Sequence, residues 1–184
     1  PADGPPPPAG EDLTVGTIAG LRAVKNLPKL VRAFAASGVS GRLRIIGEGP
    51  ERVAIEHEAE AAGVADRVDL PGFKQFDIFA LSSDSEQQPI SLIEAMAAGL
   101  PAVATDVGDV REMVSTENLP FIVPAARGDL FALALARLGC DAALRRAIGT
   151  ANRRKALQIF DEKQMISRYR ALYASAVGQR GVLD

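Results

Sequence analysis

The stretch DIFALSSDSEQQPISLIEAMAAGLPAVAT, residues 77–105, decides the predicted fold. It opens on Asp77–Leu81, which are apolar almost throughout, as expected of a buried parallel strand. A helix is predicted over Pro89–Ala98, because proline suits the first helical turn and Gly99 suits its end. A second short strand follows at Ala102–Thr105. Two strands joined by a helix form one unit of a parallel sheet, since parallel strands need a long crossover.

The same alternation of short strands and amphipathic helices extends to both sides of this unit. Further strands are predicted at Thr14–Ala19, Arg42–Ile46, Arg67–Leu70 and Pro120–Val123. Further helices are predicted at Leu27–Ala36, Glu51–Ala62, Asp109–Val114, Asp129–Leu138, Asp141–Leu157 and Asp161–Ala176. Asn26 is a suitable N-cap for the first of these helices. The predicted fold class is therefore α/β, a Rossmann-like parallel sheet with helices on both faces.

The two ends of the chain differ from the part between them. Residues 1–12 are predicted to be a linker or tail, because the first ten positions hold five prolines. Residues 13–177 are predicted to form one domain and residues 178–184 a second tail, a division that suits domains of roughly 150 residues. The last helix belongs to this domain. Its apolar positions are expected to lie in the core: Phe160, Met165, Ile166, Tyr169, Leu172 and Tyr173.

One predicted connection is too short. Only four residues separate Gly72 from Asp77, whereas neighbouring parallel strands need a crossover of about a dozen residues. Either the strands on the two sides are not parallel neighbours, or residues have been lost from this stretch. We favour the second explanation.

Composition excludes several classes of protein. The 184 residues are 47% hydrophobic and carry a net charge of −2, which argues against a nucleic-acid partner. No run approaches 18 apolar residues, so no membrane span is predicted. Cys140 and His57 are each the sole residue of their type, which excludes an internal disulfide and a zinc site of Cys and His ligands. A single cysteine suits a reducing compartment, so we expect a cytoplasmic location, and no signal peptide opens the chain.

Two carboxylates flank the start of the helix that begins at Pro89. Glu86 precedes its first turn and Glu94 lies just inside it. The free N–H groups of a first turn attract anions such as phosphate. Carboxylates repel phosphate but accept hydrogen bonds from hydroxyls, such as those of a sugar and a ribose. A nucleotide sugar carries sugar hydroxyls, a diphosphate and ribose hydroxyls in line. The alternative is that Glu86 is an ordinary loop acid and Glu94 a favourable charge near a helix N-terminus.

Two further loops follow predicted strands, where ligands bind in parallel α/β sheets. Lys25 ends the first loop and could donate to the same diphosphate, or it could be a surface lysine. Gly47 and Gly49 lie in a tight turn where backbone could approach a ligand closely, although such turns are common. The sequence contains neither G-x-G-x-x-G nor a P-loop, which argues against a dinucleotide oxidoreductase and an ATPase.

The order of short motifs along the chain resembles that of family 4 (group 1) glycosyltransferases. The motifs are Val15-Gly16-Thr17, Lys25-Asn26, Gly47-Glu48-Gly49-Pro50-Glu51-Arg52, Asp66-Arg67-Val68, the E-x(7)-E pair, Glu94-Ala95-Met96-Ala97-Ala98-Gly99-Leu100-Pro101 and Ala104-Thr105-Asp106-Val107-Gly108. The resemblance covers about Leu13 to Ala176, nearly the whole chain, and the ordered set is far more specific than any one motif. These enzymes have the GT-B fold of two Rossmann-like domains, and this chain looks like the C-terminal, donor-binding one. In such enzymes the last helix crosses back towards the N-terminal domain, so the resemblance implies that part of its apolar face meets that domain.

The resemblance implies roles for the residues that match the family's motifs. Glu86 matches the acid beside the transferred sugar, Glu94 the acid on the nucleotide ribose, and Lys25 the lysine on the diphosphate. Backbone N–H groups of Ile90, Ser91 and Leu92 would meet the same diphosphate, and Gly47 and Gly49 would line the donor site. Family members are retaining transferases without a bound divalent metal, so the resemblance implies that this chain needs none. Double displacement would need a second carboxylate near the sugar, and none is evident.

Two positions depart from the family pattern. Gly20 stands where many members have an arginine on the diphosphate, so phosphate binding is weaker unless Arg22 or another residue compensates. Gln87 and Gln88 follow Glu86 where Gly-Phe is frequent, which alters the surface next to the sugar.

The main hypothesis is the donor-binding half of a retaining, hexosyltransferase-like glycosyltransferase of polysaccharide or lipid-linked glycan synthesis. The expected partners are a nucleotide-sugar donor and an N-terminal acceptor-binding domain, through which the enzyme would associate peripherally with the inner face of a membrane. The isolated domain is expected to transfer little. The two alternatives are a degenerate, non-catalytic nucleotide-sugar-binding module and a GT-B sugar-nucleotide epimerase.

Overall fold

The computed structural model describes residues 13–70 and 76–177. In this part of the chain one parallel sheet has the strand order β3-β2-β1-β4-β5-β6. Its strands are β1 (Leu13–Ile18), β2 (Gly41–Ile46), β3 (Val68–Asp69), β4 (Ile78–Leu81), β5 (Ala102–Thr105) and β6 (Ile122–Val123). The order reverses between β1 and β4, and open α/β sheets bind ligands at the carboxyl end of such a switch point.

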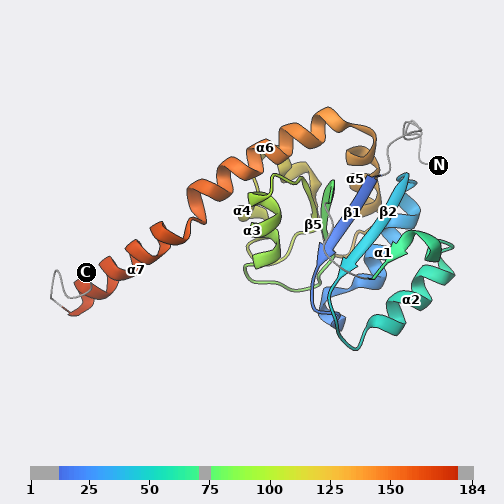
Figure 1. Ribbon diagram of the computed structural model, residues 1–184, viewed down its shortest axis with the longest axis horizontal. Helices are drawn as coiled ribbons and strands as arrows, with labels where there is room; N and C mark the ends of the chain where they lie inside the picture. Colours follow the sequence, from blue (N-terminus) through green and yellow to red (C-terminus); the bar gives the residue numbers. More distant parts are fainter. Residues whose placement is uncertain (1–12, 71–75, 178–184) are drawn as a thin grey trace.

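Helices connect these strands, and Figure 1 shows how they surround the sheet. They are α1 (Leu27–Ser37), α2 (Arg52–Ala61), α3 (Ile90–Ala97), α4 (Val110–Met113), α5 (Gly128–Cys140), α6 (Ala142–Ile159) and α7 (Glu162–Val177). Short 3-10 helices are η1 (Ala23–Lys25), η2 (Ala65–Arg67) and η3 (Thr116–Phe121).

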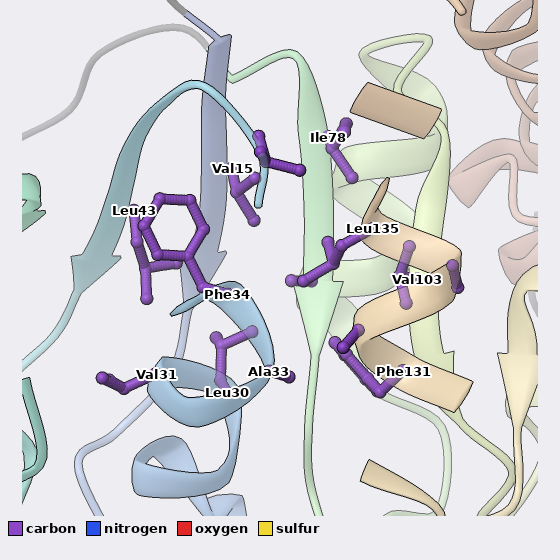
Figure 2. Close-up of a cluster of buried hydrophobic side chains, with 14 of the residues drawn as sticks. Val15, Leu30, Val31, Ala33, Phe34, Leu43, Ile78, Val103, Phe131 and Leu135 are labelled. Carbon is purple, nitrogen blue, oxygen red and sulfur yellow. The ribbon is translucent and has the colours of Figure 1, made fainter. Parts of the chain in front are cut away.

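Alternate residues of the central strands enter two separate cores. Ile78 and Ala80 of β4 belong to the core formed with α1, α2 and α5, whereas Phe79 and Leu81 belong to the core formed with α3 and α4. Figure 2 shows the first core, where Phe34 of α1 lies beside the strands. The predicted α/β fold with helices on both faces is therefore confirmed.

The last strand is shorter than predicted. A strand was expected at Pro120–Val123, but η3 runs through Phe121 and only Ile122–Val123 pairs with β5. Proline has no N–H to give to a strand ladder, and its fixed φ suits a helical turn.

The short connection before Asp77 joins strands that are parallel but not neighbours. β3 pairs with β2 at one edge of the sheet, whereas β4 pairs with β1 and β5 in its centre. The explanation that the two strands are not parallel neighbours is thus confirmed. The second, a loss of residues, concerns a stretch that lies largely outside the described residues, as do both predicted tails.

The expectation for the last helix is wrong. Figure 1 shows α7 pointing away from the sheet beyond α6. The apolar side chains predicted to be core are exposed on it: Met165, Ile166, Tyr169, Leu172 and Tyr173. Phe160, just before α7, does pack against the second core. Periodicity identified an apolar stripe, but α7 has no sheet beneath it to cover. Among the described residues no helix combines the length and apolar character needed to cross a bilayer.

Candidate functional site

Lys25 and Glu86 meet at the carboxyl end of the sheet, at the switch point. Lys25 ends η1 in the loop after β1, and Glu86 lies in the loop after β4, the neighbouring strand. The Lys25 Nζ is 2.5 Å from Glu86 Oε1. The Glu86 side chain is only 9% exposed and that of Lys25 is 24% exposed, so little water screens the pair. The structure thus joins two residues, 61 positions apart, that the sequence placed in one site.

The two oxygens of the Glu86 carboxylate have different surroundings. Oε1 also accepts a hydrogen bond of 2.6 Å from the hydroxyl of Ser83, which is buried. The Ser83 carbonyl in turn accepts a 2.5 Å bond from Thr105 Oγ1 at the end of β5. Oε2 has no partner in the described part of the chain. An ionised carboxylate only accepts hydrogen bonds, so Oε2 is the oxygen free to accept one from a ligand hydroxyl.

The backbone that carries Glu86 packs against the loop after β5. A Cβ on Gly108 would lie 2.2 Å from the Glu86 carbonyl oxygen, and Gly108 has a φ of +53°. The Asp109 N–H donates to the Gln87 carbonyl at 2.9 Å. Only glycine allows this close approach, because any side chain at position 108 would displace the Glu86 loop.

The backbone around Lys25 is also fixed by the loop after β4. The hydroxyl of buried Ser82 donates to the carbonyls of Lys25 at 2.9 Å and of Asn26 at 3.1 Å. Asn26 does occupy the N-cap position of α1, but its side chain does not cap the helix. It donates instead to the carboxylate of Asp84, with which it makes contacts of 2.8 and 3.0 Å.

The first turn of α3 begins four residues after Glu86. The amides of Ile90 and Ser91 make no hydrogen bond to the described residues, and helix N-termini attract anions. The Leu92 amide already donates to the Pro89 carbonyl at 3.1 Å. Glu94 lies one turn into α3, where it is exposed and forms no ion pair with the described residues. Ile90 and Ser91 therefore offer free donors, whereas Leu92 does not.

The turn with Gly47 and Gly49 contacts the chain itself. Both glycines have φ near +154°. A Cβ on Gly47 would lie 1.9 Å from the Ala19 carbonyl oxygen, and a Cβ on Gly49 would lie 2.4 Å from the Leu21 carbonyl oxygen. These glycines let the loop after β2 pack against the loop after β1. Their contribution to a ligand site would come from the shape of this loop pair.

Gly20 lies exposed in the loop after β1. The nearest atom to a Cβ built on it is Nε of Arg22, at 3.9 Å. Arg22 is itself exposed and has no ion-pair partner within the described part of the chain. A guanidinium is therefore available beside position 20, although Gly20 cannot supply one.

A cavity of about 560 Å³ lies at the opposite, amino-terminal end of the strands. Leu13, Asp77 and Pro101 line it where β1, β4 and β5 begin, together with Arg145 and Arg146 of α6. It shares no residue with the site at the carboxyl ends. Within residues 13–70 and 76–177, no three His, Cys, Asp or Glu side chains gather as a metal site would require.

Sequence reasoning missed the roles of Ser83 and Asp84. Both lie in a loop predicted to follow a strand, which is where site residues were expected. Short polar residues are common in loops, however, and only the packing of the two loops shows that Ser83 meets Glu86 and that Asp84 meets Asn26.

The chain is similar to known glycosyltransferases. Residues 4–155 match the model of the "Glycosyl transferases group 1" family. The chain is 27% identical over 166 residues to N-acetyl-alpha-D-glucosaminyl L-malate synthase of Bacillus anthracis, covering 85% of this chain and 44% of that protein. The chain spans less than half the length of this relative.

Solved glycosyltransferase structures have the same fold. Sucrose-phosphate synthase of Thermosynechococcus elongatus superposes with a TM-score of 0.79 at 26% identity, over 90% of this chain and 46% of that one. The C-terminal domain of a group 1 glycosyl transferase from Francisella tularensis superposes with a TM-score of 0.72 at 20% identity. That match covers 82% of this chain and 87% of that domain. The chain therefore belongs to the group 1 glycosyl transferase family and corresponds to the C-terminal domain of its GT-B fold.

Proposed function

We propose that this chain is the donor-binding half of a retaining glycosyltransferase that uses a nucleotide-diphosphate hexose. The observation that carries the proposal is the Lys25–Glu86 ion pair at the switch point of the sheet. Glu86 lies four residues before the free amides at the start of α3. One small region thus offers a cation, helix N–H donors and a carboxylate oxygen. These groups complement a diphosphate and an adjoining sugar.

In this proposal each group has one role. Lys25 and the amides of Ile90 and Ser91 bind the diphosphate, because charge-assisted and helix N-terminal donors are the strong ligands of phosphate. The Glu86 Oε2 accepts a hydrogen bond from a hydroxyl of the transferred sugar. Glu94, exposed on α3 and without an ion pair among the described residues, accepts hydrogen bonds from the ribose.

The chemical step follows from this arrangement. The acceptor hydroxyl attacks the anomeric carbon from the face that the diphosphate leaves, so the new C–O bond replaces the old one with retention. Its proton passes to the departing diphosphate oxygen. Lys25 and the α3 amides stabilise the negative charge that develops on the leaving group, which is the role a metal ion plays in other transferases. We therefore propose that no bound metal is needed.

The acceptor would bind an N-terminal half that the relatives' greater length implies. The exposed apolar side chains of α7 offer a surface for contact with that half. We propose that this chain alone binds the donor but transfers little sugar. The complete enzyme would work in the cytoplasm, at the inner face of a membrane, on glycan or lipid-linked acceptors.

Thermal unfolding in the presence of UDP, GDP, ADP and their common sugars tests donor binding. A ligand at 100 times its Kd adds about 2.7 kcal/mol to the free energy of unfolding, which raises Tm measurably. We expect one base to give the shift, and we expect Lys25→Ala and Glu94→Gln to reduce it. Lys163→Ala and Glu60→Gln, which change exposed residues of α7 and α2, are the matched controls. No shift with any nucleotide, or an equal shift in Lys25→Ala, would contradict the proposed site.

Gly20 gives some support to a second candidate, a binding module that no longer catalyses. A glycine at this position supplies no guanidinium to the diphosphate. Glu86→Gln in the protein that joins both halves separates the two candidates. A transferase should lose at least about a hundredfold in kcat, whereas unchanged turnover would show that Glu86 takes no part.

A further inference from the structure

Asp84 joins the loop that carries Glu86 to the loop that carries Lys25. Its Oδ1 accepts hydrogen bonds from Asn26 Nδ2 at 3.0 Å and Lys29 Nζ at 3.1 Å, and its Oδ2 accepts one from Asn26 Nδ2 at 2.8 Å. Its backbone N–H donates to the Val24 carbonyl at 2.8 Å. Asp84 therefore contacts the chain on both sides of Lys25.

These contacts bear directly on the backbone conformation at Lys25. Asn26, the next residue, has a φ of +45°, the one positive φ of a non-glycine residue in the described part of the chain. Asparagine adopts the left-handed conformation more readily than other residues with a Cβ, and local contacts of its side chain help to hold it there. Asp84 holds the side-chain amide of Asn26, and the Ser82 hydroxyl holds the carbonyls of Lys25 and Asn26, so both contacts stabilise the bend beside Lys25.

Lys29 extends the connection to a third loop. Its Nζ also donates to the Ala125 carbonyl, after β6, at 3.1 Å, and its side chain is only 12% exposed. Burial raises the pKa of Asp84, but the hydrogen bonds from Asn26 and Lys29 and the charge of Lys29 outweigh it, so the pKa is lowered overall. Asp84 is thus ionised near neutral pH, and through Lys29 of α1 it connects the loops after β1 and β4 to the loop after β6.

We propose that Asp84 is a positioning residue for the donor diphosphate: it fixes the loop after β1 so that Lys25 is held beside Glu86. This inference rests on the proposed function, because it assigns Lys25 to the diphosphate. The Asp84 side chain itself is half exposed. Its removal should therefore loosen the loop far more than it destabilises the core.

Isothermal titration calorimetry with UDP, GDP and ADP, on the 184-residue chain, measures the effect. Loss of a charge-assisted bond to phosphate in Lys25→Ala should weaken binding about tenfold or more. We expect Asp84→Ala to weaken binding about fivefold and Asp84→Asn less, since an amide oxygen still accepts from Asn26. If Asp84 acts through Lys25, the double variant should bind no more weakly than Lys25→Ala alone. Glu58→Gln, which removes another ion pair of α1, with Arg32, should leave binding unchanged.

Amide hydrogen exchange supplies a second readout. The amides of Lys25 and Asn26, which donate to Arg22 and Ala23 carbonyls, should exchange faster in Asp84→Ala, while core amides stay protected.

Four results would overturn the inference. They are additive losses in the double variant, unchanged affinity in Asp84→Ala, a general loss of protection, and equal weakening by Glu58→Gln. If the wild-type chain binds none of the three nucleotides, or if Lys25→Ala binds as wild type does, the proposed function itself fails and this inference fails with it.

Discussion

At the scale of single residues, Ser83 sets the position of the Glu86 carboxylate. Its hydroxyl is the nearest neutral donor to Oε1, and burial keeps the hydroxyl from turning to water. Ser83→Ala should leave Glu86 held by Lys25 alone. We expect binding of a nucleotide sugar to weaken severalfold, while binding of the parent nucleoside diphosphate changes little, because only the sugar meets Glu86. Calorimetry with both ligands checks this, and equal losses for the two would contradict it. Ser85→Ala, in the same loop but exposed, is the control.

A second residue-scale prediction concerns pH. Hydrogen bonds from Arg42 lower the pKa of Asp69 from 3.8 to about 2; burial opposes this shift and Arg44 adds to it. Because the folded pKa lies below the unfolded value, the ion pair stabilises the fold above pH 4. Its contribution fades as the pH falls from about 4 to 2.

Urea unfolding of the wild-type chain and Asp69→Asn checks this sign. The wild type should be the more stable at pH 6, and the difference should shrink toward pH 2. A difference that stays constant or grows in acid would contradict the assignment. Asp66→Asn, an exposed aspartate nearby, is the control and should show no such trend.

At the scale of elements, the buried side chains of Asn118 and Asn152 connect α6 to β5 and to the end of α3. Asn118 receives 2.8 Å bonds from the Ala102 N–H and from Asn152 Nδ2, and it donates to the Ala102 carbonyl at 2.8 Å. Asn152 also donates to the Leu100 carbonyl at 2.9 Å. Both side chains are fully buried.

Asn118→Ala should leave the buried N–H and carbonyl of Ala102 without side-chain partners, and it should remove one of the two hydrogen bonds that Asn152 Nδ2 donates. The expected cost is about 2–4 kcal/mol in the free energy of unfolding, since each unsatisfied group costs roughly 1–3 kcal/mol. Chemical denaturation measures it, with Thr150→Ala on the exposed side of α6 as the control. A loss below 1 kcal/mol would show that water or rearrangement satisfies these groups.

Elements were predicted more reliably than contacts between them, for physical reasons. The apolar run of β4 and the proline and glycine that bound α3 act locally, so both elements were found within a residue or two. The contact between Lys25 and Glu86 depends on β1 and β4 being neighbours. Their positions after strands allowed a shared site but left a surface lysine as the alternative, and only the resemblance assigned both residues to one donor. Asn26 was expected to cap α1, but a local propensity could not reveal the competing carboxylate of Asp84.

At the scale of the whole molecule, α7 shows that the chain has an unpaired apolar surface. Tyr169, Leu172 and Tyr173 are more than half exposed, and they follow one another along the helix face. Periodicity predicted this stripe but not what lies opposite it, because it reports only amphipathicity. The resemblance alone suggested the N-terminal domain as its partner.

Leu172→Ser with Tyr173→Ser should therefore change the unfolding free energy of this chain by no more than about 0.5 kcal/mol, as for ordinary surface substitutions. In the protein that joins both halves, the same double variant should lower Tm and weaken transfer. Differential scanning calorimetry of both forms checks this, with Arg168→Ser and Arg170→Ser as the control pair. Marked destabilisation of the 184-residue chain by the double variant would mean that α7 packs on this domain.

A map of the residues that a nucleotide contacts tests the proposed donor site directly. Amide NMR spectra of this 19.4 kDa chain, recorded during a titration with UDP, GDP or ADP, give that map residue by residue. We expect the largest shifts at Lys25, Ile90 and Ser91, and we expect Lys25→Ala to reduce them. Shifts gathered around Leu13, Pro101 and Arg145 at the other end of the sheet would contradict donor binding at the proposed site.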